Sequence, residues 1–437
     1  PDGRILRPEP GPGFGRDLAR LTAGLNRTPP VPTPPDTVDP GWEELLDRLR
    51  AEPSFIPLDA DAVEVLTLDQ SELTAADRRR FYAALSADVN QRLAAAAVPG
   101  GLLSPGTCRQ ARAVFRRWST VWFMGLLFRS LPDSYAAAAG VHVLGEVSEL
   151  ATDPFRRCGE TAQFIVDLLG REDGWGPDGL IPEGDAYRSV VGIRAMHAIV
   201  AHHLLAAGWD SARYGLPLNA EDVLGTALTF GVSPVEMLDQ LGFDVPGTQR
   251  EAWVRFWLGI GHLLGAPLGT VTTAGPAGPV PLTYPQARDL ARFIRSRHHA
   301  RSLDGVRLAE AIVAGTADGF PRGLGWLAAG LMQVLGDPRV VELLLLRGGN
   351  RREAALVIRG FSLLLGTRAT RPAGRVLVRT IGAFWVRPFL RQGRTRPYRR
   401  PLRPGDRARL TWSRRVALAW PLSCAVAAPP GRPAAGT

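Results

Sequence analysis

The stretch DPFRRCGETAQFIVDLL constrains the fold most, because its helical periodicity places polar side chains inside an apolar face. Asp153 followed by Pro154 is a favourable helix start. Arg157 and Thr161 lie one turn apart on the apolar face, and Glu160 lies at its edge. A buried guanidinium requires an anionic partner. Spacing alone favours an internal ion pair with a nearby carboxylate, and the functional alternative is a ligand carboxylate or a polar pocket.

The stretch VVGIRAMHAIVAHHLL, which follows a Gly/Pro loop, predicts a second helix that faces the first. His197 lies at the centre of its apolar face and Arg194 shares that face, whereas His202 and His203 point elsewhere. A lone histidine there is more often a hydrogen-bonded core residue than a metal ligand. The chain has no HExxH, no CxxC and no His pair at i, i+4, which argues against zinc. The absence of CxxCH excludes covalent haem, whereas non-covalent haem with one axial histidine stays open.

The basic charge of the chain is concentrated in one segment. All 52 basic residues are arginine, which excludes lysine Schiff-base and P-loop chemistry. Between Arg368 and Arg415 there are fifteen arginines and one acid, so the rest of the chain carries about −4 of the net charge of +10. A basic segment with interspersed apolar residues is a candidate for contact with an anionic membrane surface. A solvated arginine-rich segment is the favoured alternative, and nucleic acid is the least favoured partner.

Cysteine usage and hydropathy bear on the compartment. Cys108, Cys158 and Cys424 form no disulfide framework and are compatible with a reducing compartment. No run of 18 or more apolar residues predicts a membrane-spanning helix. No secretory signal is visible, although a leader removed before Pro1 stays open. We expect a cytoplasmic protein, with peripheral membrane attachment through the basic segment as the alternative.

Hydrophobic periodicity and punctuation by Gly and Pro predict an all-α chain, because β-branched alternation is scarce. Hydrophobic residues make up 45% of the chain, enough for a globular core. We predict a Pro/Gly-rich arm at 1–40, a helical domain at 41–366 and an Arg-rich tail at 367–437. Within the domain we expect a loop at 266–282 and helices at 42–50, 74–97, 106–130, 220–230 and 248–265.

Four strings, taken together, resemble the haem-b oxygenases that include the rubber oxygenases and the MpaB-like oxygenases. They are LFRSLPDSYAAAAGVHVL with the helix that follows it, VGIRAMHAIVAHHLL, GLPLNAEDVLGTALTF and WVRFWLGIGHLLGAP. The resemblance covers residues 125–267 well and the region to about 350 loosely, and it leaves out the arm and the tail. It implies a multi-helix bundle with a globin-like core around a pocket for non-covalent haem b.

The resemblance also implies roles for residues in this pocket. His197 would be the proximal iron ligand and Arg157 and Thr161 would lie on the distal side. Arg194 is a candidate partner for a haem propionate. The remaining walls would come from Thr226, Phe230 and Trp257.

Two positions depart from the rubber-oxygenase pattern. Glu160 stands where rubber oxygenases have a lysine that can ligate the iron, so it would instead pair with Arg157 or hydrogen-bond a distal water. The catalytic glutamate of the preceding helix has no certain counterpart: its place falls on Val141, with Glu146 and Glu149 nearby. These departures put rubber cleavage itself in doubt.

The resulting functional hypothesis is an oxygenase that uses O₂ and an unidentified electron donor on an apolar, isoprenoid- or lipid-like small molecule or polymer. The first alternative is a non-catalytic haem-binding sensor or carrier on the same scaffold. The second is a membrane-associated helical protein without a cofactor, attached through its arginine-rich segment.

Overall fold

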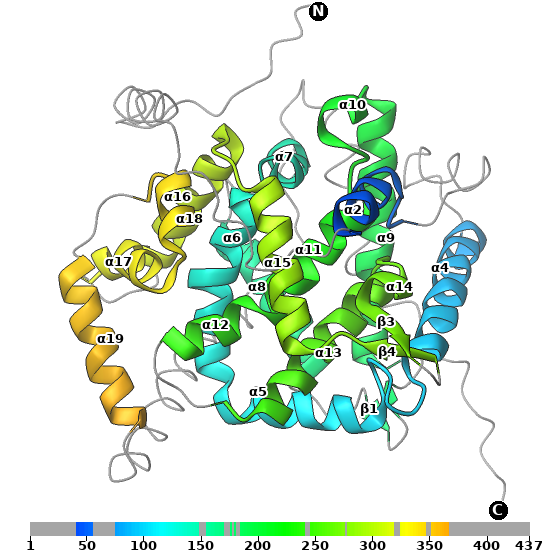
Figure 1. Cartoon of the computed structure of the whole chain (residues 1–437). Helices are drawn as coiled ribbons and strands as arrows, with labels where there is room; N and C mark the ends of the chain where they lie inside the picture. The colour runs from blue at the N-terminus through cyan, green and yellow to red at the C-terminus, as the bar shows by residue number, and fades with distance from the viewer. Residues whose placement is uncertain are drawn as a thin grey trace, which may run out of the picture.

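A computed structural model describes residues 41–55, 75–147, 154–169, 175–176, 179–180, 184–240, 245–275, 278–318, 324–346 and 351–366. The described chain is mostly helical, with α11 and α13 through its middle, α16 to α19 on one side and α4 on the other (Figure 1). The predicted arm at 1–40 and tail at 367–437 lie outside the described residues.

The described elements follow one another along the chain in this order: α2 Trp42–Ala51, α4 Ala75–Ala96, α5 Pro105–Gly125, the π-helix η1 Leu126–Ser130, α6 Leu131–Ala136, α7 Ala138–Val147, α8 Pro154–Leu169, β1 Trp175–Gly176, β2 Gly179–Leu180, α9 Asp185–Ala206, α10 Ser211–Tyr214, α11 Ala220–Gly231, α12 Ser233–Gln240, α13 Gly247–Leu263, α14 Leu268–Val271, β3 Thr272–Gly275, β4 Gly278–Pro281, α15 Tyr284–His298, α16 Leu303–Asp318, α17 Trp326–Leu335, α18 Pro338–Leu343 and α19 Arg351–Gly366.

The predicted helices are present, and local capping explains several of their starts. Asn219 begins α11 by accepting a hydrogen bond from the backbone N–H of Asp222 at 2.9 Å. Thr283 and Gln286 form a reciprocal capping box at the start of α15. Gly100, with φ of +75°, follows the end of α4, where the left-handed region favours glycine.

The expectation of a helical fold is confirmed at the level of a mostly helical chain, and the described residues also contain two short antiparallel β-hairpins. One pairs β1 with β2, and the other pairs β3 with β4 in the register Thr272↔Pro281 and Gly275↔Gly278. The second hairpin and α14 occupy the stretch that we predicted as a loop, 266–282. Four-residue strands rich in Pro and Gly carry too little alternation to be recognised from periodicity.

The centre of the core is built by α13, which packs against both α11 and α5. The rings of Trp253 and Trp122 stack with centroids 4.1 Å apart. Gly261 allows α13 to approach α11 closely, since a Cβ there would lie 2.5 Å from the Cβ of Ala227. The fully buried face of α13 therefore determines where α11 lies.

The predicted pairing of the two organising helices is confirmed, since α8 packs against α9. α4 packs on α9 as well. Among the described residues, α9 is the one helix long and apolar enough to cross a membrane by length and composition, and 59% of its apolar window is buried within the protein.

Candidate functional site

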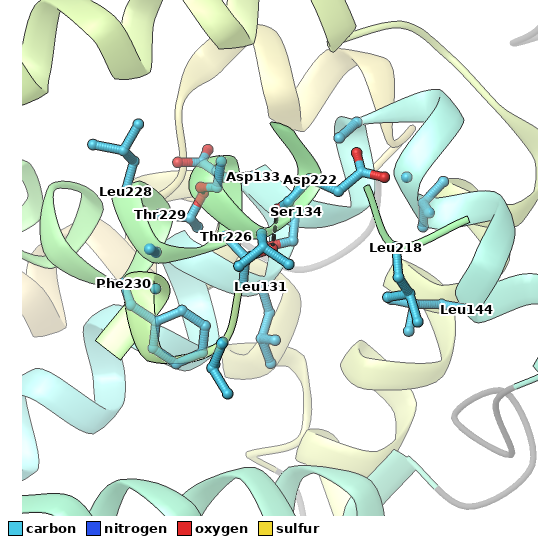
Figure 2. A pocket seen from close by; sticks show the side chains of 18 of the residues that line it. Leu131, Asp133, Ser134, Leu144, Leu218, Asp222, Thr226, Leu228, Thr229 and Phe230 are labelled. Atoms are coloured by element: carbon cyan, nitrogen blue, oxygen red, sulfur yellow. Dashed lines mark hydrogen bonds between the residues drawn. The ribbon is translucent and has the colours of Figure 1, made fainter. Parts of the chain in front are cut away.

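A cavity of about 340 Å³ lies between α6, α7, α8, α9, α11, α13 and α15, and its walls are mainly apolar. Figure 2 shows part of its lining, with Asp133, Asp222 and Thr226 among aliphatic side chains and with Phe230 near its edge. A space of this size and character can hold a largely apolar ligand.

His197 of α9 lines this cavity, and its buried Nδ1 atom has no hydrogen-bond partner among the described residues. Burial, and to a smaller degree the charge of Arg194, lowers the pKa of His197 to about 4. The imidazole is therefore neutral near pH 7, the form that ligates a metal. Among the described residues there is no group of three or more His, Cys, Asp or Glu side chains placed to hold a metal ion. Any metal at His197 would have to bring its other ligands with it.

Another part of the wall is formed by α8, which contributes Glu160 and Thr161 together with Cys158 and Phe164. The apolar face predicted for this helix therefore does meet the cavity. Arg157 lies in α8 as well, but its side chain is outside the described part of the structure. The structure thus brings Glu160, Thr161 and His197 to one cavity, and their catalytic roles remain predictions.

The three residues predicted to complete the walls also line the cavity. Thr226 and Phe230 come from α11 and Trp257 from α13. The ring centroids of Phe230 and Trp257 lie 4.8 Å apart, and the buried Trp257 Nε1 atom has no hydrogen-bond partner in the part of the chain that the structure describes. The Thr226 hydroxyl donates a hydrogen bond to the backbone carbonyl of Asp222 at 2.8 Å, which is a contact within α11 itself.

Arg194 is placed differently from the sequence-based expectation, because it is not among the residues that line the cavity. Its buried guanidinium donates to Asp88 at 2.5 Å, to the Leu264 carbonyl at 2.9 Å and to the Ser54 carbonyl. An i, i+3 spacing puts Arg194 on the His197 side of α9, but the long side chain reaches α4 instead. Its guanidinium is thus engaged away from the cavity.

The positions on and after α7 that were considered for a catalytic carboxylate are Val141, Glu146 and Glu149. Val141 does line the cavity, whereas Glu146 is exposed and is absent from the lining. Glu149 lies outside the described residues. The described part of α7 therefore contributes no carboxylate to the cavity.

Sequence reasoning missed the polar part of the cavity, where Asp133, Glu221 and Asp222 line the wall with Arg295 and His298. Asp222, Thr226 and Phe230 recur at i, i+4 and i+8, so they face the cavity together. This stripe could have been recognised, but acids in the first turn of a helix are ordinarily dipole-favoured surface residues.

The carboxylates in this polar part of the cavity differ in how well nearby arginines neutralise their charge. Asp133 pairs with Arg295 at 3.1 Å and accepts from the Ser233 hydroxyl at 2.7 Å. Burial would raise the pKa of Glu236, but Arg295 and Arg129 together hold it below its usual range. With Asp337, which lies 3.8 Å from Arg129, these groups form a network of three acids and two arginines.

Asp222 lacks an arginine partner of this kind. Burial is the largest effect on Asp222 and raises its pKa to about 6, although His298 lowers the pKa; Glu221 adds a smaller raising effect, and Arg50 and Asn219 add smaller lowering ones. Among the described residues, Asn219 is the one side chain that donates a hydrogen bond to its carboxylate, at 2.8 Å. Asp222 is therefore an unusually basic carboxylate at the wall of the cavity, as groups at functional sites often are.

These features define a class: a mostly helical protein whose core encloses a mainly apolar cavity lined by the neutral histidines His197 and His299 and by a separate acidic region. Residues 112–417 match the family described as "ER-bound oxygenase mpaB/B'/Rubber oxygenase, catalytic domain". The chain belongs to this family of oxygenases, since the match spans well over half of its length. The matched range runs to residue 417 and so corrects our expectation that the arginine-rich segment lies outside the resemblance.

Other comparisons add less. A comparison with curated proteins gives no significant match. The solved structure titled "Structure of Latex Clearing Protein LCP in the closed state" is 16% identical, with 92% of this chain and 86% of that chain covered and a TM-score of 0.37.

Proposed function

We propose that this protein is a haem-b-dependent oxygenase that uses O₂ to oxidise an apolar, isoprenoid- or lipid-like substrate, with His197 as the iron ligand. The observation that carries the proposal is the neutral, buried His197 on the wall of a mainly apolar cavity, in a chain of this oxygenase family. The globin-like arrangement of helices around the cofactor is part of the same proposal.

The residues present fit a non-covalent haem. A buried imidazole nitrogen without a partner is costly unless a ligand uses the ring, and the neutral ring offers a lone pair to iron. The aromatic and aliphatic walls, including Phe164, Phe230 and Trp257, suit a flat apolar macrocycle. When bound, haem would supply the oxygen chemistry that side chains cannot perform.

The side chains of the cavity would bind the substrate and place polar groups beside the reacting atoms. The apolar walls would hold the hydrocarbon part of the substrate and exclude water. Thr161 would position a hydrogen bond beside the reacting atoms, with Arg157 of the same helix as its predicted companion. Glu160 would hold a proton or a water at the same wall. An electron donor and contact of the arginine-rich segment with an anionic membrane, in an otherwise cytoplasmic protein, remain part of the proposal.

The visible absorption spectrum tests the proposal most directly. Purified protein, with and without dithionite, is expected to show a Soret band that His197→Ala weakens or shifts. His202→Ala is the matched control, because His202 lies on the same helix but does not line the cavity. A colourless wild type that fails to take up added haem, or identical spectra for both variants, contradicts the proposal.

The second candidate is a haem-binding sensor or carrier, favoured by the lack of a described carboxylate on α7 at the cavity. Consumption of O₂ that depends on an added isoprenoid or lipid separates the two. An enzyme consumes O₂ with substrate, whereas a carrier shows the spectrum and no such consumption.

A further inference from the structure

Two carboxylates of the α11 first turn, Glu221 and Asp222, line the cavity, and each has one oxygen to which the described residues donate no hydrogen bond. Glu221 is 1% exposed and lines the cavity, and its Oε2 atom is buried and unpartnered. Its other oxygen accepts from His298 at 2.7 Å and lies 3.3 Å from Arg297. A buried carboxylate oxygen that accepts no hydrogen bond is unfavourable, so a ligand that donates a hydrogen bond here would be stabilised.

Asp222 repeats this arrangement on the neighbouring residue. Its Oδ2 atom accepts from Asn219, whereas no described donor reaches Oδ1. Oδ1 faces Gly140 of α7, where a Cβ would lie 2.9 Å away. Gly140 also lines the cavity, so the absent side chain leaves space directly beside this oxygen.

Nearby positive charge does not neutralise the pair fully. Arg297 shares its guanidinium with Glu43 at 2.8 Å and Asp47 at 2.7 Å as well as with Glu221. One arginine thus serves three carboxylates, and none of its hydrogen bonds goes to Asp222. The region therefore disfavours an anionic group and favours a hydrogen-bond donor.

Helix α11 runs from the Glu221 and Asp222 carboxylates to the apolar part of the cavity wall. Asp222 and Phe230 are two turns apart, or about 12 Å along the helix axis, and both face the cavity. A ligand that extends along this helix would meet carboxylates at one end and aromatic rings at the other (Figure 2).

We infer that Glu221 and Asp222 form a head-group site that selects apolar chains ending in a hydrogen-bond donor, a hydroxyl or an ammonium group, over chains ending in a carboxylate. The inference deepens the proposed function, since it takes the same cavity as the substrate site and names the substrate class. No oxidation step is required for it, so binding alone tests it.

Calorimetric titration of the purified full chain with decan-1-ol, decylamine and decanoate is the experiment. The alcohol and the amine are expected to bind at least about tenfold more tightly than decanoate, the scale of one charge-assisted hydrogen bond. Asp222→Asn and Glu221→Gln should each reduce this preference, and the double variant should bring it below about threefold. Glu44→Gln removes an exposed carboxylate of α2 and should leave the preference unchanged.

Equal binding of the three ligands to wild type, no binding of any, or an unchanged preference in a folded double variant overturns the inference. Circular dichroism establishes folding, and the single variants keep the test open if the double variant unfolds. Haem content measured on the same samples separates the two proposals. Head-group preference without haem refutes only the haem oxygenase, and haem without preference refutes only the head-group site.

Discussion

Replacing Asp222 with asparagine is expected to stabilise the folded protein at neutral pH, because the half-buried wild-type carboxylate is ionised where desolvation disfavours its charge. Its folded pKa of about 6 lies above the ordinary value of 3.8. Two pKa units correspond to about 3 kcal/mol. Asparagine keeps the shape of aspartate and can still accept the hydrogen bond from Asn219, so little else is lost.

The pH dependence follows from the direction of this shift. The folded state binds the Asp222 proton more tightly than the unfolded state does. The contribution of Asp222 to stability is therefore fully present below about pH 3.8 and is lost as pH rises through about 6. The advantage of the asparagine variant should grow with pH over this window, with roughly 1.4 kcal/mol of the increase falling between pH 5 and pH 8.

Urea denaturation at pH 5 and pH 8 measures both quantities as differences in the free energy of unfolding. Glu44→Gln, which removes an exposed carboxylate, is the control for net charge. A variant that is less stable than wild type at pH 8, or an advantage that shrinks as pH rises, would refute the reasoning. It would mean that the Asp222 carboxylate is stabilised by partners as an ion.

Two further substitutions test the packing around the cavity. Gly261→Ala should destabilise the protein by about 1–3 kcal/mol in thermal denaturation, because its Cβ would meet the Cβ of Ala227 at 2.5 Å. Gly269→Ala, with nothing within 4 Å of its Cβ, is the control, and equal effects would contradict this account. Asp88→Asn should cost about 3 kcal/mol in urea denaturation, because it leaves the 1% exposed Arg194 without its charged partner. An unchanged urea midpoint would show that backbone carbonyls suffice for this guanidinium.

Much of the helical framework was predictable because helix formation leaves local signals. Asn219 caps α11 where the sequence predicts it, and α8 and α9 follow the predicted apolar periodicity. The placement of His197 on an apolar face is a property of one helix and needs no tertiary information. The β3–β4 hairpin was missed because its strands are only four residues long and Gly or Pro occupies half of their positions.

The sequence by itself determined which side chains each helix presents to an apolar face, since this depends only on residue spacing. Only the tertiary structure decided which faces meet. It turned the Arg194 guanidinium toward Asp88, and it placed Glu221 and Asp222 at a cavity although a helix start of that kind is usually solvent-exposed. The physical reason is that burial and ion pairing arise between segments far apart in the chain, where close packing leaves one arrangement.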